Sequence, residues 1–191
     1  VYSEIADDFD VSLTDMAFLT TATLVMRPVG AFLFGLWADR RGRRLPLMVD
    51  VVFYSIVGFA CAFAPNYAVL LVLRLLYGIG MGGEWGLGAA LAMEKIPAER
   101  RGFWSGLLQS GYSLGYLLAA VAFFGIEPAF GWRGLFAFSL VPALVALWVR
   151  TRVEESEVWE QSVQLNRTPA YQVFKNPAVL KRFVYLVALM T

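Results

Sequence analysis

Long apolar stretches are the feature that most constrains how this chain folds. Five follow one another along the sequence: Met16–Ala38, Leu45–Ala64, Tyr67–Met93, Phe103–Ile126 and Gly134–Val149. Most of them reach the roughly 20 residues that a helix needs to cross a bilayer core about 30 Å thick. The last is shorter, but Trp132 and Trp148 at its ends are suited to the membrane interface. Since only 16% of the residues are charged, against about 25% in soluble domains, the sequence predicts an all-α integral membrane protein.

The basic residues predict how these spans are oriented. Most of them fall in alternate connections, which contain Arg40, Arg41, Arg43 and Arg44 after the first stretch, Lys95, Arg100 and Arg101 after the third, and Arg150, Arg152, Arg167, Lys175, Lys181 and Arg182 after the fifth. The intervening connections, Pro65–Asn66 and 127–132, contain no basic residue. Because cytoplasmic loops are enriched in Lys and Arg, we expect the first stretch to run inward. The N-terminal segment is then outside, in a protein of the cell (inner) membrane.

The two ends of the sequence indicate that further spans belong to the protein. The sequence starts at Val1, and its last residues, Phe183–Thr191, begin a sixth apolar run. The acidic first 15 residues lack the basic n-region of a cleavable signal. Residues 151–181 are polar and are interpreted as a cytoplasmic linker. A single cysteine, Cys61, allows no intrachain disulfide.

The stretch "GLWADRRGRR", residues 35–44, joins the first two spans in the pattern G-x-x-x-D-R-x-G-R-R. One interpretation is a tight basic loop whose charges only set topology. A second gives the residues separate roles: Gly35 lets helices approach closely, Asp39 caps or faces a helix N-terminus, and Arg43 pairs with a nearby carboxylate. The motif resembles the cytoplasmic loop signature between helices two and three of the major facilitator superfamily.

The resemblance extends over most of the chain. Arg74 followed by "GIGMGG" is similar to the family's fourth helix, and "RTRVEESEVWEQ" resembles the segment that closes its sixth. This implies the major facilitator fold with an N-terminal half that lacks its first helix. Residues 1–150 would form helices two to six, 151–181 the inter-lobe linker and 182–191 the start of helix seven. Residues 80–120 are similar to the sialate:proton symporter branch, to which lactate and pyruvate permeases belong.

The resemblance also implies a cytoplasmic gate. Its members would be Gly35, Asp39, Arg40, Gly42, Arg43, Arg44 and Glu94. Asp39 would meet the second lobe, and Arg43 would pair with an acid such as Glu94 at the inner end of the third stretch. We expect these contacts to hold the outward-open state and to release when the inside opens.

Five glycines surround Glu84, which shares its apolar stretch with only one other charged residue, Arg74. A dinucleotide-binding loop requires a preceding strand and a water-exposed helix start, and a membrane span excludes both. The four-residue spacing of Gly78, Gly82 and Gly86 instead predicts close helix packing. A smooth glycine face would also let one helix slide on another during alternating access.

Glu84 and Arg27 are both predicted near the middle of the membrane. Glu84 lies ten residues from Glu94, and Arg27 twelve from Asp39, which corresponds to roughly 15 and 18 Å of helix from the inner end. Intramembrane charges are functional candidates by default. Three interpretations are open. Arg27 and Glu84 form a static ion pair, or Arg27 binds the carboxylate of the substrate. In the third, Glu84 carries the transported proton, since burial favours the neutral form of a carboxyl group. We favour a combination in which Glu84 carries the coupled proton and Arg27 alternates between Glu84 and the substrate. Arg74 is a weaker candidate nearer the outer face.

The fourth stretch, Phe103–Ile126, has no charge but carries a polar stripe. Ser105, Gln109, Tyr112 and Tyr116 recur at helical spacings of four, three and four. The stripe either hydrogen-bonds neighbouring helices or lines a watery cavity, and the sequence leaves both open. The stretch also lacks the Gly-Pro pair of the facilitator antiporters, which favours symport or uniport.

Taken with the resemblance, these features predict a proton-coupled symporter of a small organic acid, such as lactate, pyruvate or sialate. The alternatives are a transporter of another metabolite, such as a sugar or a dicarboxylate, and a transport-dead sensor with the same fold. An enzyme is not expected, because the chain has no histidine, no metal-ligand cluster and no nucleophile–base arrangement. We expect no cofactor, no metal and no nucleic acid, with protons and a small anion as partners and a monomer as the complete protein.

Overall fold

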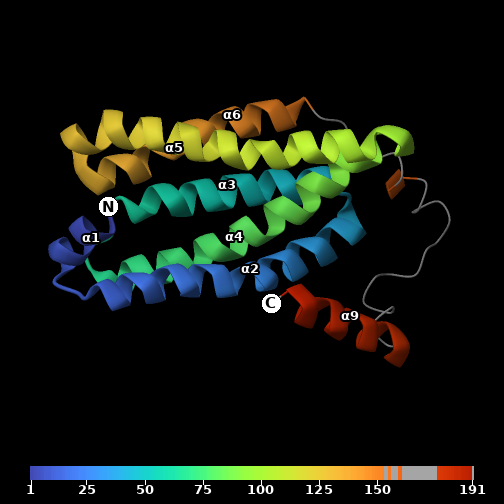
Figure 1. Ribbon diagram of the computed structural model, residues 1–191, viewed down its shortest axis with the longest axis horizontal. Helices are drawn as coiled ribbons and strands as arrows, with labels where there is room; N and C mark the ends of the chain where they lie inside the picture. Colours follow the sequence, from blue (N-terminus) through green and yellow to red (C-terminus); the bar gives the residue numbers. More distant parts are fainter. Residues whose placement is uncertain (153–154, 156–158, 161–175, 191) are drawn as a thin grey trace.

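The chain folds into a bundle of long helices, seen in a computed structural model that describes residues 1–152, 155, 159–160 and 176–190 (Figure 1). The helices are α1 (Tyr2–Phe9), α2 (Leu13–Arg41), α3 (Arg44–Cys61), α4 (Tyr67–Glu94), the 3₁₀ turn η1 (Ala98–Arg100), α5 (Arg101–Phe138), α6 (Leu140–Thr151) and α9 (Pro177–Met190). Helix α3 lies between the pair α2–α4 and the pair α5–α6 (Figure 1). The predicted linker lies mostly outside the described residues.

Side-chain caps begin both α2 and α4 at the same end of the bundle. Ser12 and Asp15 form a reciprocal capping box on α2, with Asp15 N donating to Ser12 Oγ and Ser12 N to Asp15. The Asn66 side chain accepts from Val69 N at 2.9 Å and caps α4. The Tyr67 hydroxyl donates to the Asp15 carbonyl at 2.8 Å, so the two starts lie side by side. This end is the predicted outer face.

Glycines bring α2 and α4 into backbone contact. A Cβ built on Gly78 would overlap the carbonyl oxygen of Thr23, and one built on Gly82 would overlap that of Arg27. From the other side, a Cβ on Gly30 would overlap the backbone of Ile79. The predicted close packing is therefore present at Gly78 and Gly82, where it fixes how the two helices align along their axes. It does not extend to Gly86, the third glycine of the predicted face, where a Cβ would meet no atom within 4 Å.

Helix α1 covers the outer end of the bundle. Ile5 and Ala6 are buried in a cluster with Met16, Leu19, Cys61, Ala64, Leu70 and Trp132. Asp8 forms an ion pair with Arg133, and the Arg133 guanidinium lies 4.2 Å from the centre of the Trp132 ring. The segment before the first predicted span is thus docked on a cluster formed by the outer ends of α2, α3, α4 and α5.

The boundary between the fourth and fifth predicted spans is set by Gly131. Helix α5 reverses direction there, because Gly131 has φ 61° and ψ −167°, a conformation that favours glycine (Figure 1). The fifth predicted span, 134–149, is divided between the end of α5 and α6, with Ser139 between them. Four helical segments in the described part of the chain are long and apolar enough to cross a membrane, and that of α5 has no buried residue in its most apolar window.

Cysteine labelling provides a test of the predicted orientation. In the complete protein with Cys61→Ala, we expect Arg41→Cys to react with a membrane-impermeant maleimide only after the cells are opened. Pro65→Cys, at the opposite end of the bundle, should react in intact cells and serves as the matched control. Labelling of Arg41→Cys in intact cells would contradict the orientation. Both wild-type residues are exposed, and neither has a glycine-specific backbone.

Candidate functional site

Arg27 reaches from α2 across to α4. Its Nη2 donates to the sulfur of Met81 at 3.3 Å, and its Nε is buried without a hydrogen bond. Its backbone carbonyl lies against Gly82. Glu84 is two residues beyond Gly82, so the two charged residues differ in depth by about 3 Å along the helix axis. The two residues therefore lie at similar levels along the bundle, as predicted, and their position near the middle of the membrane stays a prediction.

One face of α4 carries two residues of the predicted pathway, Arg74 and Glu84, together with Tyr77 and Met81, which were not predicted. Arg74, Tyr77, Met81 and Glu84 follow one another at spacings of three, four and three, which places them in a row. The hydrogen bond described above joins Arg27 to Met81. An ion pair between Arg27 and Glu84 stays a prediction.

Arg74 lies at the outer part of this row, beside a cavity. Its guanidinium stands over two rings, 4.5 Å from the centre of Phe136 and 5.5 Å from that of Tyr77. The cavity has a volume of about 430 Å³ and is lined by Val1, Tyr2, Gly58, Arg74, Tyr77, Trp132, Leu135, Phe136 and Ser139. Arg74 Nε is also buried without a hydrogen bond. The structure thus places Arg74 toward the outer end, as expected for the weaker candidate.

The polar stripe of α5 is open. Ser105, Gln109, Tyr112 and Tyr116 are all exposed, with 50% of Tyr112 and 76% of Tyr116 accessible. Tyr112 lies beside Trp85 of α4, with ring centres 6.5 Å apart. The described helices therefore do not cover the stripe. Whether it lines a cavity stays a prediction.

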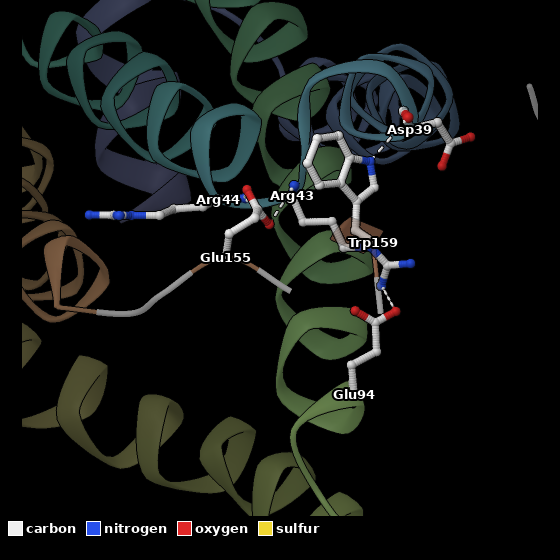
Figure 2. Close-up of polar contacts among 6 residues, drawn as sticks. All are labelled: Asp39, Arg43, Arg44, Glu94, Glu155 and Trp159. Atoms are coloured by element: carbon white, nitrogen blue, oxygen red, sulfur yellow. Dashed lines mark hydrogen bonds and ion pairs between the residues drawn. The ribbon is translucent and has the colours of Figure 1, made fainter. Parts of the chain in front are cut away.

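The predicted gate residues meet at the opposite end of the bundle (Figure 2). Arg43 forms the predicted ion pair with Glu94, joining the start of α3 to the end of α4. Asp39 is exposed and, with Gly35 and Arg43, lines a groove of about 240 Å³ between α2 and α4. A Cβ on Gly35 would meet no atom within 4 Å, so the close helix approach predicted at Gly35 is not found among the described residues. Arg40 is exposed. The expected contact of Asp39 with a second lobe concerns residues beyond this sequence.

Glu155 was not predicted as part of the gate. Its carboxylate accepts from Arg43 N at 3.0 Å and from Arg44 N at 3.1 Å, and so caps α3 (Figure 2). A Cβ on Gly42, which has φ 90°, would overlap this carboxylate. The N-terminus of α3 is therefore capped by Glu155. Asp39 was predicted to cap or face a helix N-terminus, and that role stays a prediction. The only signal for it was an acidic run at residues 154–160.

Two more contacts tie Thr151, the last residue of α6, and Trp159 to residues of the predicted gate. Arg44 Nη2 donates to the Thr151 carbonyl at 2.9 Å. Trp159 Nε1 donates to the Asp39 carbonyl at 3.2 Å (Figure 2). Residues 39–44 are thus held by Glu94 of α4 on one side and by Thr151, Glu155 and Trp159 on the other.

Asp39→Asn in the complete protein is expected to lower the turnover number at least tenfold while leaving substrate binding within about twofold. The reason is that a gate contact affects the change of state, and a loss of about 1.4 kcal/mol corresponds to a factor of ten. Transport kinetics and equilibrium binding on the same preparation measure the two effects. Glu99→Gln, at another exposed acid on this face, is the control. Wild-type turnover in Asp39→Asn at equal expression would remove Asp39 from the gate.

Comparison with known proteins identifies the family. The sequence profile of the Major Facilitator Superfamily matches residues 1–191. The chain belongs to this superfamily. Its fold is accordingly confirmed as a partial major facilitator fold, in a multi-pass membrane protein.

Individual relatives are transporters. The chain is 35% identical over 159 residues to a probable 4-methylmuconolactone transporter of Cupriavidus pinatubonensis, covering 81% of this chain and 37% of that protein. It is 31% identical over 181 residues to the sialic acid transporter NanX of Escherichia coli, covering 93% and 45%. The inward-open structure of the xylose transporter XylE from E. coli aligns with a TM-score of 0.69 at 23% identity, covering 92% and 45%. The chain thus spans less than half the length of these relatives, and the last likeness concerns the fold alone.

Proposed function

We propose that the complete protein is a secondary active transporter of the inner membrane that couples proton entry to the uptake of a small organic acid by alternating access. The observation that carries the proposal is the meeting of Arg27 with the face of α4 that bears Met81 and Glu84. A guanidinium at that depth suits a carboxylate, which it can bind with two parallel hydrogen bonds. A carboxyl group at the same level suits a transported proton.

The relatives support an acid as the substrate class. Sialic acid, for which NanX is named, carries one carboxylate. A sugar is less well supported as the substrate, because a neutral sugar has no charge that would require Arg27. A transport-dead sensor with this fold would keep the same site and would differ only in the absence of net flux.

Uptake by the complete protein in proteoliposomes tests the proposal. The panel consists of radiolabelled pyruvate, L-lactate, N-acetylneuraminate, shikimate and nicotinate, with xylose as the neutral comparison. We expect counterflow of at least one acid and its accumulation when the outside is acidic, with collapse by a protonophore. Counterflow of xylose alone would indicate a sugar transporter. Absence of any counterflow, with binding retained, would indicate a sensor.

A further inference from the structure

We propose that Trp85 of α4 and Tyr112 of α5 form an aromatic site for the body of the substrate, so that the protein selects carboxylic acids that carry a ring. The indole and phenol rings lie beside each other, with centres 6.5 Å apart and planes inclined by 51°. The proposal rests on the proposed function and names the substrate class of the same site. Trp85 was not among the pathway residues predicted from the sequence.

Trp85 lies one helical turn from the contact that Arg27 makes on α4. Arg27 Nη2 donates to the sulfur of Met81 at 3.3 Å. Trp85 follows Met81 by four residues, which places the two side chains on the same helix face, about 6 Å apart along the axis. A ring joined to a carboxylate can bridge this interval. Pyruvate and lactate extend only about 2.5 Å beyond the carboxylate carbon, at roughly 1.5 Å per bond.

Both rings lie well inside the predicted spans. Trp85 is nine residues before the end of α4 at Glu94, and Tyr112 is eleven residues after the start of α5 at Arg101. At 1.5 Å per residue these positions are about 14 and 17 Å from the inner ends of the two helices. Aromatic residues that face lipid gather instead at the membrane interfaces, where their polar groups reach water. A Trp–Tyr pair at this depth is better explained by a role inside the protein.

The two side chains are uncovered and offer polar groups as well as rings. Trp85 is 53% exposed and Tyr112 50%. Among the described residues, neither the indole N–H nor the phenol hydroxyl has a hydrogen-bond partner. Tyr112 also belongs to the polar stripe with Ser105, Gln109 and Tyr116. Because lipid cannot satisfy polar groups, this stripe and the rings beside it suit a watery pathway.

The chemistry of the pair fits a ring better than a short open chain. The faces of the two side chains carry partial negative charge, which attracts the edge or the offset face of another ring. The indole N–H and the phenol hydroxyl can bond to ring nitrogen or hydroxyl groups. With its carboxylate on Arg27, a ring-bearing acid is held at two points and so in one orientation. A short acid meets Arg27 alone.

Trp85→Leu in the complete protein tests the proposal, because it keeps an apolar side chain and removes the ring. The probe is whichever of nicotinate, shikimate and N-acetylneuraminate the wild type exchanges fastest in proteoliposomes. We expect the wild-type kcat/KM for this ring acid to exceed that for pyruvate at least tenfold. In Trp85→Leu its KM should rise about tenfold, the order of one lost aromatic contact with its buried area. The inhibition constant of pyruvate should stay within about twofold.

Three further variants separate binding from packing. Trp85→Phe keeps a ring and should hold the KM of the ring acid within about threefold of the wild type. Tyr112→Leu should repeat the effect of Trp85→Leu, and it decides the test if size exclusion shows that Trp85→Leu does not fold. Trp104→Leu is the matched control, because Trp104 is also exposed on α5 but lies eight residues before Tyr112. It should leave both constants unchanged.

An equal rise in the KM of the ring acid and the inhibition constant of pyruvate would assign the two rings to packing and overturn the proposal. An unchanged KM in Trp85→Leu and Tyr112→Leu would also overturn it, as would a wild type that prefers pyruvate to every ring acid. If the wild type exchanges none of the acids, the proposed function fails instead, before the rings are tested.

Discussion

Glu84→Gln is expected to leave substrate exchange intact and to abolish accumulation against a gradient. Exchange requires the binding site and the change of state, neither of which consumes a proton. Accumulation requires that a proton enter with each substrate, and glutamine has the shape of a protonated glutamate but cannot release the proton. We expect counterflow in proteoliposomes within about threefold of the wild type, and pH-driven accumulation reduced to equilibration.

The matched control for this prediction is Glu84→Asp. It keeps an ionisable carboxyl group at the same position, so accumulation should persist at a reduced rate. A static ion pair with Arg27 predicts another pattern, because a buried charge that loses its partner destabilises a fold by about 3–5 kcal/mol. In that case the amount of folded Glu84→Gln protein, its exchange activity and its accumulation activity would all fall together. Accumulation by Glu84→Gln at the wild-type level would make the carboxylate structural.

The sequence predicted those parts of the structure that depend on local pattern. Apolar length located the first four spans but not the fifth, which is divided between α5 and α6. The spacing of the glycines predicted the face on which α4 packs at Gly78 and Gly82, although not at Gly86. The pairing of Arg43 with Glu94 was also predicted, as an implication of the resemblance to the family's cytoplasmic loop signature. The packing face needs only the helical repeat, whereas the ion pair depended on the resemblance.

The parts that were missed depend on contacts between distant segments. Glu155 caps α3 from more than 100 residues away, and no local pattern distinguishes it from the other acids of its run. Met81 was not singled out, because a methionine is common in an apolar helix. Its hydrogen bond with Arg27 depends on where a different helix places the guanidinium. The docking of α1 on Trp132 depends in the same way on a distant segment, because the turn at Gly131 lies more than 120 residues after the end of α1.

The seam between α2 and α4 should be the part of the site that tolerates least change. Gly82→Ala adds one methyl group where the Arg27 carbonyl oxygen already lies, so the helices must separate. If this overpacking costs about 3 kcal/mol, the unfolding midpoint falls by about 10 °C. Fluorescence-detected size exclusion of the complete protein after heating measures the unfolding midpoint.

Gly102→Ala is the control, because a Cβ on Gly102 meets no atom within 4 Å and the residue is also helical. Its midpoint should be unchanged or slightly higher, since alanine favours a helix over glycine. Equal midpoints for Gly82→Ala and the wild type would mean that the helices are not in backbone contact at this level. Arg27 would then be held to α4 only by the hydrogen bond of its side chain to Met81.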